Sequence, residues 1–464
     1  MPIESYNPHT GRVLRRFSAF SWAKTERILG QAHHAAASWQ ATSFAHRAKV
    51  LRAAAALLRE RQHDLARLMA LEMGKPVADG RAEVLKCATC CEYYAEHAEG
   101  FLADEIIKTD ARRSFISYQP LGVVLAVMPW NFPLWQVVRF AAPALMAGNV
   151  GLLKHASNVP QCALALEKIF HDAGLPPACF RTLLIGSDLV EKLLTDDRVR
   201  AATLTGSEGA GAAVAAIAGA QIKKTVLELG GSDAFIVLAD ADIALAAKTA
   251  AQSRMINSGQ SCIAAKRFIV EKPVLKDFIN QLKTHLLALR PGDPLEESTQ
   301  YGPLARPDLA DELTQQVADS VAQGAKVELF GGQAKPGTAL FRPVILSNVK
   351  PGQRAYAEEF FGPVALVLEA KNADDAVRLA NDSRFGLGAA VWTADAQKGE
   401  AMARQLESGA VFVNGLVKSS SELPFGGVKK SGYGRELSYL GIREFVNQKS
   451  IWIGKEAVAT AKTE

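Results

Sequence analysis

The sequence of 464 residues lacks the features that mark several special classes of protein. Six cysteines are too few for a disulfide framework in a chain of this length, so we expect a reducing, cytoplasmic environment. No apolar run is long enough to span a membrane. Residues 1–4 show no charged segment followed by an apolar one, so we expect no secretory signal.

A strong charge of either sign is also absent. Lysine and arginine (53) barely outnumber aspartate and glutamate (48), and the basic residues are scattered along the chain. A massed basic patch is typical of proteins that bind nucleic acid or a membrane surface, so we expect neither partner. The hydrophobic content of 48% indicates an ordinary globular protein, and the length predicts two or three domains.

One cysteine cluster has a spacing that is found in metal and redox sites. Cys87, Cys90 and Cys91 lie within residues 82–97, whose pattern predicts a continuous helix. No second Cys/His pair follows at zinc spacing. We therefore interpret the three cysteines as buried helix residues, and we predict no metal site.

The first hundred residues are helical in pattern, and the chain then changes character. Helices are predicted over residues 25–39, 44–73 and 82–97. From residue 121, short β-branched runs alternate with helical segments. The predicted strands are 123–128, 150–154, 180–185, 201–204 and 225–229, separated by helices 133–147, 160–173, 188–195 and 211–218. This alternation predicts a parallel, doubly wound sheet, which binds ligands at the carboxyl ends of its strands.

A second α/β region follows. Its predicted strands are 266–270, 326–330, 363–368, 388–392 and 410–413, and its predicted helices are 273–289, 308–323, 373–380 and 396–406. Two extended stretches, 115–118 and 450–453, fit neither region. Extended segments from distant parts of a chain indicate an accessory sheet, which proteins often use to pair subunits.

Three residues of the two α/β regions are candidates for catalysis. Cys262 lies in a segment that contains Gly259 and is a possible nucleophile, and Glu228 thirty-four positions upstream is a possible base. Asn131, in Pro-Trp-Asn-Phe-Pro at 129–133, could direct an amide N–H at a developing oxyanion. Spacing alone fits an inert cysteine and an ordinary turn equally well.

Further polar motifs suit a nucleotide. Lys154 ends the strand predicted at 150–154 and Ser157 follows it, where they could bind a ribose or a phosphate or lie in solvent. Residues 205–211 begin a helix whose N-terminus could hold a pyrophosphate, although they do not match the G-x-G-x-x-G motif. Glu359 could accept hydrogen bonds from a ribose or be a surface acid.

Taken together, these motifs resemble those of the aldehyde dehydrogenase superfamily over almost the whole chain. The segments that carry the resemblance are 129–133, 154–157, 205–207, 227–231, 259–262, 358–363 and 424–432. Seven motifs in the expected order are highly specific. Within the superfamily, the stretches 93–97, 128–139 and 432–438 look most like those of bacterial succinate-semialdehyde dehydrogenases.

The resemblance implies an α/β fold with three parts. A Rossmann-type cofactor domain would comprise residues 1–102 and 121–230, and an α/β catalytic domain would comprise residues 231–436. Residues 103–120 and 437–464 would form a small oligomerisation element built from strands. Members of the family are oligomeric, so we expect a homodimer or a homotetramer.

The resemblance also implies a role for each motif. Cys262 would attack the aldehyde carbon, Asn131 would hold the oxyanion, and Glu228 would activate the water that hydrolyses the thioester. Residues implied to bind or line the cofactor site are Trp130, Lys154, Ser157, Gly206, Ser207, Leu229, Glu359 and Phe361. Many NAD-preferring relatives carry a glutamate where this chain has Ser157, so we expect both NAD and NADP to be used.

The substrate implied is a short semialdehyde. Arg139, eight positions after Asn131, would face the substrate tunnel and bind the distal carboxylate, and Ser420 would offer a hydroxyl to the same group. Some relatives have a second arginine six positions before the nucleophile. Here that position is Ile256, with Arg254 as a candidate substitute.

Several alternatives fit the same sequence. Glutarate semialdehyde or an aliphatic aldehyde could be the substrate. A CoA-acylating dehydrogenase is a rival, but acylating relatives commonly lack a base at the position of Glu228. A catalytically silent structural protein of this fold is disfavoured, because Cys262, Glu228 and Asn131 are all present.

Overall fold

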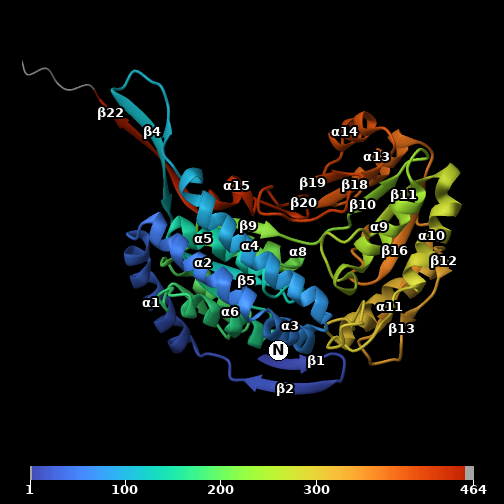
Figure 1. The fold of residues 1–464 in the computed structure, drawn as a ribbon, viewed down its shortest axis with the longest axis horizontal. Coiled ribbons are helices and arrows are strands. Elements are labelled where there is room, and N and C mark those ends of the chain that lie inside the picture. The colour runs from blue at the N-terminus through green and yellow to red at the C-terminus, as the bar shows by residue number, and fades with distance from the viewer. Residues whose placement is uncertain (1–2, 455–464) are drawn as a thin grey trace, which may run out of the picture.

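The computed structural model describes residues 3–454, which form two α/β lobes and a projecting β-ribbon (Figure 1). The remaining residues, 1–2 and 455–464, belong to the predicted cofactor domain and oligomerisation element and lie outside the described residues. A short hairpin of β1 (Ile3–Asn7) and β2 (Arg12–Phe17) begins the described chain. Within residues 3–454, none of the helices combines the length and the apolar character that crossing a membrane requires.

The first lobe contains a six-stranded sheet in the order β21-β9-β8-β5-β6-β7. The strands are β5 (Val123–Met128), β6 (Val150–His155), β7 (Phe180–Thr182), β8 (Val199–Thr205), β9 (Lys224–Glu228) and β21 (Gly432–Tyr433). All pairs except β21–β9 are parallel, so the predicted doubly wound sheet is confirmed. Its helices are α1 (Trp22–Gln40), α2 (Phe44–Glu60), α3 (Gln62–Met73), α4 (Val77–Phe101), α5 (Trp135–Ala147), α6 (Pro160–Asp172), α7 (Asp188–Thr195) and α8 (Glu208–Ala220).

The second lobe contains a seven-stranded sheet in the order β12-β15-β16-β11-β10-β18-β19. The strands are β10 (Ala234–Val237), β11 (Arg267–Glu271), β12 (Lys326–Leu329), β15 (Val344–Ser347), β16 (Val364–Ala370), β18 (Gly388–Trp392) and β19 (Ala410–Val413). The helices are α9 (Ile243–Met255), α10 (Leu275–Leu287), α11 (Pro307–Ala322), α12 (Arg354–Ala357), α13 (Ala373–Asn381) and α14 (Ala396–Ala403). Short pieces complete it: 3₁₀ turns η1 (Ile256–Gly259) and η2 (Lys272–Val274), and strands β13 (Gly332–Gln333), β14 (Phe341–Arg342), β17 (Phe385–Gly386) and β20 (Val428–Lys429).

The structure differs from the sequence-based elements in several places. The helix predicted over 44–73 is wrong, because the chain bends at Arg61 between α2 and α3. Both helices pack against α4, and the bend lets each of them follow it. The strands β10 and β15 were not predicted, because a short apolar run does not distinguish a strand from a helix. The helix α9 was not predicted either.

The predicted accessory sheet is confirmed as a pairing of distant segments. The strand β4 (Arg113–Pro120) pairs antiparallel with β22 (Val446–Ile453) along its whole length, and β3 (Glu105–Ile106) lies on the other side of β4. This three-stranded ribbon projects away from the first lobe (Figure 1). Just before β22, the short helix α15 (Ser438–Ile442) packs against α4 and α5.

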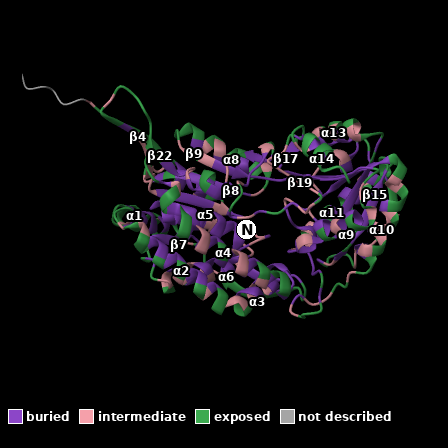
Figure 2. Ribbon diagram, turned by 45° about the horizontal axis from the view of Figure 1, so that its top comes forward, coloured by how far each residue is buried: buried purple, intermediate pink, exposed green. Residues whose placement is uncertain are grey.

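Buried residues fill the space around each sheet (Figure 2). The two lobes are also joined by the backbone, because β21 returns from the second lobe to the edge of the first sheet. This strand lies in the range predicted for the catalytic domain, yet it pairs with β9, with Gly432 opposite Glu228. Gly432 has a φ of 113°, and a Cβ there would overlap the carbonyl oxygen of Leu227.

Replacement of Gly432 by alanine is expected to destabilise the protein. The strained φ and the overlap with Leu227 should lower the free energy of unfolding by about 2 kcal/mol or more. Differential scanning calorimetry would detect this as a lower Tm. Gly219→Ala on the exposed face of α8, where nothing lies within 4 Å of an added Cβ, should leave the Tm unchanged or slightly higher. Equal Tm values for both variants would contradict the account of β21.

Candidate active site

Cys262 follows a backbone turn of unusual conformation. Asn257 (φ 52°), Ser258 (φ 57°) and Gly259 (φ 81°) are successive left-handed residues, separated from the end of α9 only by Ile256. A Cβ on Gly259 would overlap the backbone of Gly362. Non-glycine residues rarely adopt this conformation and keep it only where the surroundings impose it. The segment before Cys262 therefore has one defined path.

Asn131 is tied directly to that path. Its side-chain amide donates a hydrogen bond to the carbonyl of Gln260 (3.1 Å), two residues before Cys262. Its amide oxygen accepts one from Gln136 (3.1 Å), and its backbone carbonyl accepts one from Asn257 (2.7 Å). One N–H of the Asn131 side-chain amide is thus used in the hydrogen bond to Gln260. The other N–H remains available for a hydrogen bond to an oxyanion.

The thiol of Cys262 lines a cavity of about 280 Å³ between the two lobes. The first lobe contributes α4 and α5 to its wall, and the second lobe contributes the turn around Cys262 and the segment 416–425. The lining residues are Lys75, Asp79, Ala82, Glu83, Lys86, Phe132, Trp135, Gln136, Arg139, Ile256, Asn257, Ser261, Cys262, Ile263, Leu416, Val417, Lys418, Ser419 and Phe425. Asn131 and Glu228 are not among them.

The electrostatic environment of Cys262 favours the protonated thiol. Burial raises the pKa of Cys262 to about 12, although the positive charges of Arg139 and Lys266 act in the opposite direction. Lys266 donates to the carbonyls of Ser261 (2.9 Å) and Cys262 (2.8 Å), so its ammonium group lies beneath the backbone of this segment. A thiolate must therefore be generated by a base during the reaction.

Glu228 is a buried carboxylate that could be that base. It ends β9, is 2% exposed, and neither of its carboxylate oxygens has a hydrogen-bond partner within the described chain. Burial raises its pKa well above the ordinary value, and the nearby carboxylate of Glu436 raises the pKa further. A carboxylate with a raised pKa binds a proton more strongly and suits general base catalysis near neutral pH.

Arg139 lines the cavity, but its charge is already paired. Its guanidinium forms a buried ion pair with Glu436, and it lies 4.5 Å from the centre of the Phe425 ring. A further contact joins it to Thr205 (3.4 Å). The cation predicted to bind the substrate therefore balances Glu436, which in turn is coupled to Glu228.

Two other predicted substrate residues lie outside the cavity wall. Ser420 is not among the residues that line the cavity, whereas its neighbour Ser419 is. Arg254, the candidate substitute for an arginine at position 256, is fully buried and donates to the carbonyl of Gly259 (2.6 Å). It supports the left-handed turn, and Ile256 occupies the cavity wall.

Predicted nucleotide-binding residues lie at the carboxyl ends of neighbouring strands. Lys154 is the second-to-last residue of β6, and Ser157 lies two residues after the end of that strand. Gly206 and Ser207 follow β8, where the Ser207 hydroxyl accepts a hydrogen bond from the backbone of Ala210 and caps α8. The parallel pairing of β5 with both β6 and β8 brings these two strand ends to one edge of the sheet.

Residues from both lobes complete this region. The carboxylate of Glu359 accepts a hydrogen bond from the backbone N–H of Gly231 (3.2 Å) and forms an ion pair with Lys266 (3.2 Å). The rings of Trp130 and Phe361 meet edge to face, with centroids 5.8 Å apart. Leu229 lies against α8, where an added Cβ on Gly211 would come within 2.6 Å of its side chain.

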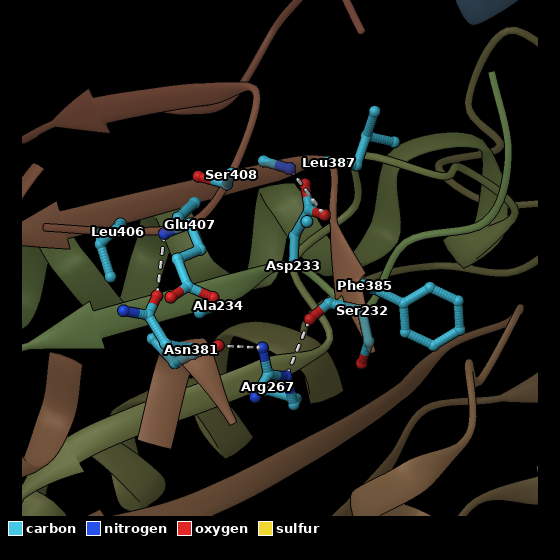
Figure 3. Close-up of a pocket in the computed structure, with 14 residues that line it drawn as sticks. Ser232, Asp233, Ala234, Arg267, Asn381, Phe385, Leu387, Leu406, Glu407 and Ser408 are labelled. Carbon is cyan, nitrogen blue, oxygen red and sulfur yellow. Dashed lines mark hydrogen bonds between the residues drawn. The ribbon is translucent and has the colours of Figure 1, made fainter. Parts of the chain in front are cut away.

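A cluster of buried side chains holds the turn after Glu228 in place (Figure 3). Arg267 donates to the carbonyls of Ser232 (2.8 Å) and Ala380 (2.8 Å), and Asp233 accepts from the backbone of Gly388 (3.1 Å). Burial raises the pKa of Asp233 to about 7. This cluster connects the end of β9 to the second sheet, so the position of Glu228 depends on both lobes.

The sequence reasoning missed several residues of α4. Glu83 and Lys86 lie one helical turn apart and both line the cavity, as does Lys75 just before the helix. The spacing 79, 82–83, 86 places these residues on one face of a helix. Charged residues on a face that otherwise points to the core could have indicated a site there. Lys266 was missed because a lysine at the start of a strand gives no such pattern.

Comparisons with known proteins agree on one family. A model of the aldehyde dehydrogenase family matches residues 1–451. A probable succinate-semialdehyde dehydrogenase (NADP+) of Synechocystis sp. is 53% identical, over 98% of this chain and 100% of the relative. Succinate-semialdehyde dehydrogenase (NADP+) 1 of Mycobacterium tuberculosis is 51% identical, over 98% and 100%. A succinic semialdehyde dehydrogenase from Streptococcus pyogenes, solved with NADP+, is 36% identical with a TM-score of 0.95, over 98% and 100%.

Alkylation of Cys262 is expected to accelerate steadily with pH. Because its pKa is raised to about 12, the thiolate fraction should grow about tenfold for each pH unit between pH 6.5 and 9.5. Rates of iodoacetamide labelling would measure this. Cys262→Ser should remain unlabelled on the same timescale, since the other five cysteines are buried. A rate that levels off below pH 8 would contradict a raised pKa.

Proposed function

The chain belongs to the aldehyde dehydrogenase family, and we propose that it oxidises succinate semialdehyde to succinate with NADP as the hydride acceptor, and that it also uses NAD. The observation that carries this proposal is the cavity at Cys262, which combines a nucleophile with cationic side chains in its wall. Relatives at 51–53% identity that carry the name of this activity support the choice of substrate. Succinate semialdehyde has an aldehyde for the thiol and a carboxylate for the cations.

The proposed chemistry begins at the thiol. Glu228 accepts the proton of Cys262 directly or through water, and the sulfur attacks the aldehyde carbon to form a C–S bond. The free amide N–H of Asn131 and the backbone N–H of Cys262 donate hydrogen bonds to the resulting oxyanion. The carbon becomes a thioester when its hydride leaves for the bound NADP, and Glu228 gives its first proton to solvent. Glu228 then removes a proton from the water that attacks the thioester, which breaks the C–S bond and releases succinate, and the sulfur regains a proton.

A buried amine supports the cofactor assignment. Burial lowers the pKa of Lys154, and among residues 3–454 no carboxylate lies within ion-pair distance of its ammonium group. A partly buried ammonium group of this kind fits an anionic ligand, and we propose that Lys154, Ser157, Gly206 and Ser207 hold the nucleotide. When bound, the cofactor supplies the hydride acceptor.

The nicotinamide end of the cofactor is proposed to lie between the lobes. There Glu359 would accept hydrogen bonds from the ribose, and Trp130, Leu229 and Phe361 would surround the ring. These residues come from both lobes, and this arrangement excludes water from the region next to Cys262. The presence of a buried Glu228 favours hydrolysis of the thioester over its transfer to CoA.

We also propose a homo-oligomer, either a dimer or a tetramer, that assembles through the ribbon of β3, β4 and β22. Trp452 is 60% exposed and Ile106 is 64% exposed on this ribbon, and exposed apolar strands of this kind suit pairing between subunits. The division of the chain into cofactor, catalytic and oligomerisation parts is proposed on the same basis. All six cysteines are free, which supports a cytoplasmic location.

The substrate proposal predicts a preference that steady-state kinetics can measure. The kcat/KM for NADPH formation should be higher with succinate semialdehyde than with butanal, which has the same number of carbons and no carboxylate. An advantage of at least about tenfold is expected from hydrogen bonds to a charged group. Comparable values for both aldehydes would remove succinate semialdehyde from the proposal and leave the aldehyde unspecified.

The cofactor proposal predicts that a carboxylate at position 157 is harmful to NADP binding. Ser157→Glu should lower the ratio of kcat/KM for NADP to that for NAD by about tenfold or more, because the carboxylate repels the 2′-phosphate. Ser157→Gln, which has the same size without the charge, should change this ratio by less than about threefold. An unchanged ratio in Ser157→Glu would place the 2′-phosphate elsewhere.

A further inference from the structure

The cations that line the cavity differ in what already balances their charge. Lys75 forms a buried ion pair with Glu83, and Arg139 forms one with Glu436. Lys418 is exposed. Lys86 is half-buried, and no carboxylate lies within ion-pair distance of its ammonium group in the part of the chain that the structure describes. An ammonium group withdrawn from water without a counter-ion is costly, unless a ligand supplies the missing charge.

Lys86 is held in a fixed position. Its ammonium group donates a hydrogen bond to the hydroxyl of Ser419 (2.7 Å) and lies 4.2 Å from the centre of the Trp135 ring. An ammonium group has three N–H donors, and one of them is used by Ser419. The hydrogen bond and the ring therefore hold the cation at the cavity wall, with donors still available.

The hydroxyl of Ser419 has a donor of its own to offer. Its oxygen accepts hydrogen bonds from both Lys86 and the indole N–H of Trp135 (3.2 Å). These two bonds occupy both lone pairs of the oxygen, so the O–H must point away from them. Lys86 and Ser419 thus carry neighbouring N–H and O–H donors, and both residues line the cavity that Cys262 also lines.

We propose that Lys86, assisted by the hydroxyl of Ser419, binds the distal carboxylate of the substrate and determines the specificity for semialdehydes. Arg139 instead keeps Glu436 neutralised beside Glu228 and acts as a positioning residue. The inference rests on the proposed function, because it assumes an aldehyde with a carboxylate at its far end. A carboxylate accepts hydrogen bonds from an ammonium group and a hydroxyl at the same time, and this complements the two donors.

The protonation state of Lys86 gives the proposal a pH dependence. Burial lowers the pKa of Lys86 to about 8, with Arg139 on α5 acting in the same direction and Glu83, Cys87 and Cys90 on α4 opposing it. Below pH 8 the amine is charged and attracts a carboxylate, and above pH 8 the free enzyme loses this attraction. The KM for succinate semialdehyde should therefore rise above pH 8, whereas the KM for butanal should not rise with it.

Substitution of Lys86 tests the proposal in the full-length enzyme. Lys86→Met keeps the length of the side chain and removes its charge. It should raise the KM for succinate semialdehyde about 10- to 100-fold with little change in kcat, and should change butanal oxidation less than about twofold. Lys86→Arg should recover part of the preference and abolish the rise in KM above pH 8. Lys248→Met, which makes the same change at an exposed position of α9 that does not line the cavity, should match the wild type.

Each outcome of this experiment is decisive. Butanal oxidation by Lys86→Met reports that the variant is folded. Equal losses with both aldehydes would give Lys86 a structural role and overturn the proposal. An unaltered preference in Lys86→Met, together with a lost preference in Arg139→Met, would assign the carboxylate to Arg139 and also overturn it. Wild-type enzyme that does not prefer succinate semialdehyde would instead refute the proposed function, and this is measured before any variant.

Discussion

The buried ion pair between Lys75 and Glu83 is the interaction on which the arrangement of the site depends. Glu83 accepts hydrogen bonds from the backbone N–H groups of Leu134 and Trp135, where α5 begins (both 2.9 Å). Lys75 donates to the backbone carbonyl of Asn131 (3.0 Å). The pair therefore joins α4, the Asn131 loop and α5, which together carry much of the cavity wall. Removal of either partner would leave a buried charge without compensation, at a cost of about 3–5 kcal/mol.

The site separates its charges into two groups. In the first group, burial and the neighbouring carboxylate of Glu436 raise the proton affinity of Glu228, and the positive charge of Arg139 opposes this rise. In the cavity wall, Lys86 has no such partner among the described residues. An arginine that neutralises the carboxylate beside the base is not free to bind a ligand. The site therefore uses Arg139 for the carboxylates and Lys86 for the ligand.

Much of this arrangement could be predicted from the sequence, and the remainder depends on contacts between distant residues. The alternation of strands and helices from residue 121 predicts the parallel sheet, and the motifs around Cys262, Glu228 and Asn131 predict the chemistry. The pairing of Arg139 with Glu436 could not be foreseen, because 297 positions separate two residues that meet only through β21 and α5. The loop that presents Ser419 rather than Ser420 has no regular period, so its register follows from packing alone.

The left-handed turn before Cys262 shows how the fold opposes a local preference. Asn257 and Ser258 occupy a region that costs non-glycine residues about 1–3 kcal/mol each. Their conformation is maintained by contacts from separate parts of the chain, including Asn131 in the first lobe, Arg254 at the end of α9 and the backbone of Gly302, which donates to the Ser258 hydroxyl (3.0 Å). Since these contacts come from both lobes, the thiol reaches its position only when the lobes are packed together. The strain is therefore confined to the segment where the direction of one side chain matters for the reaction.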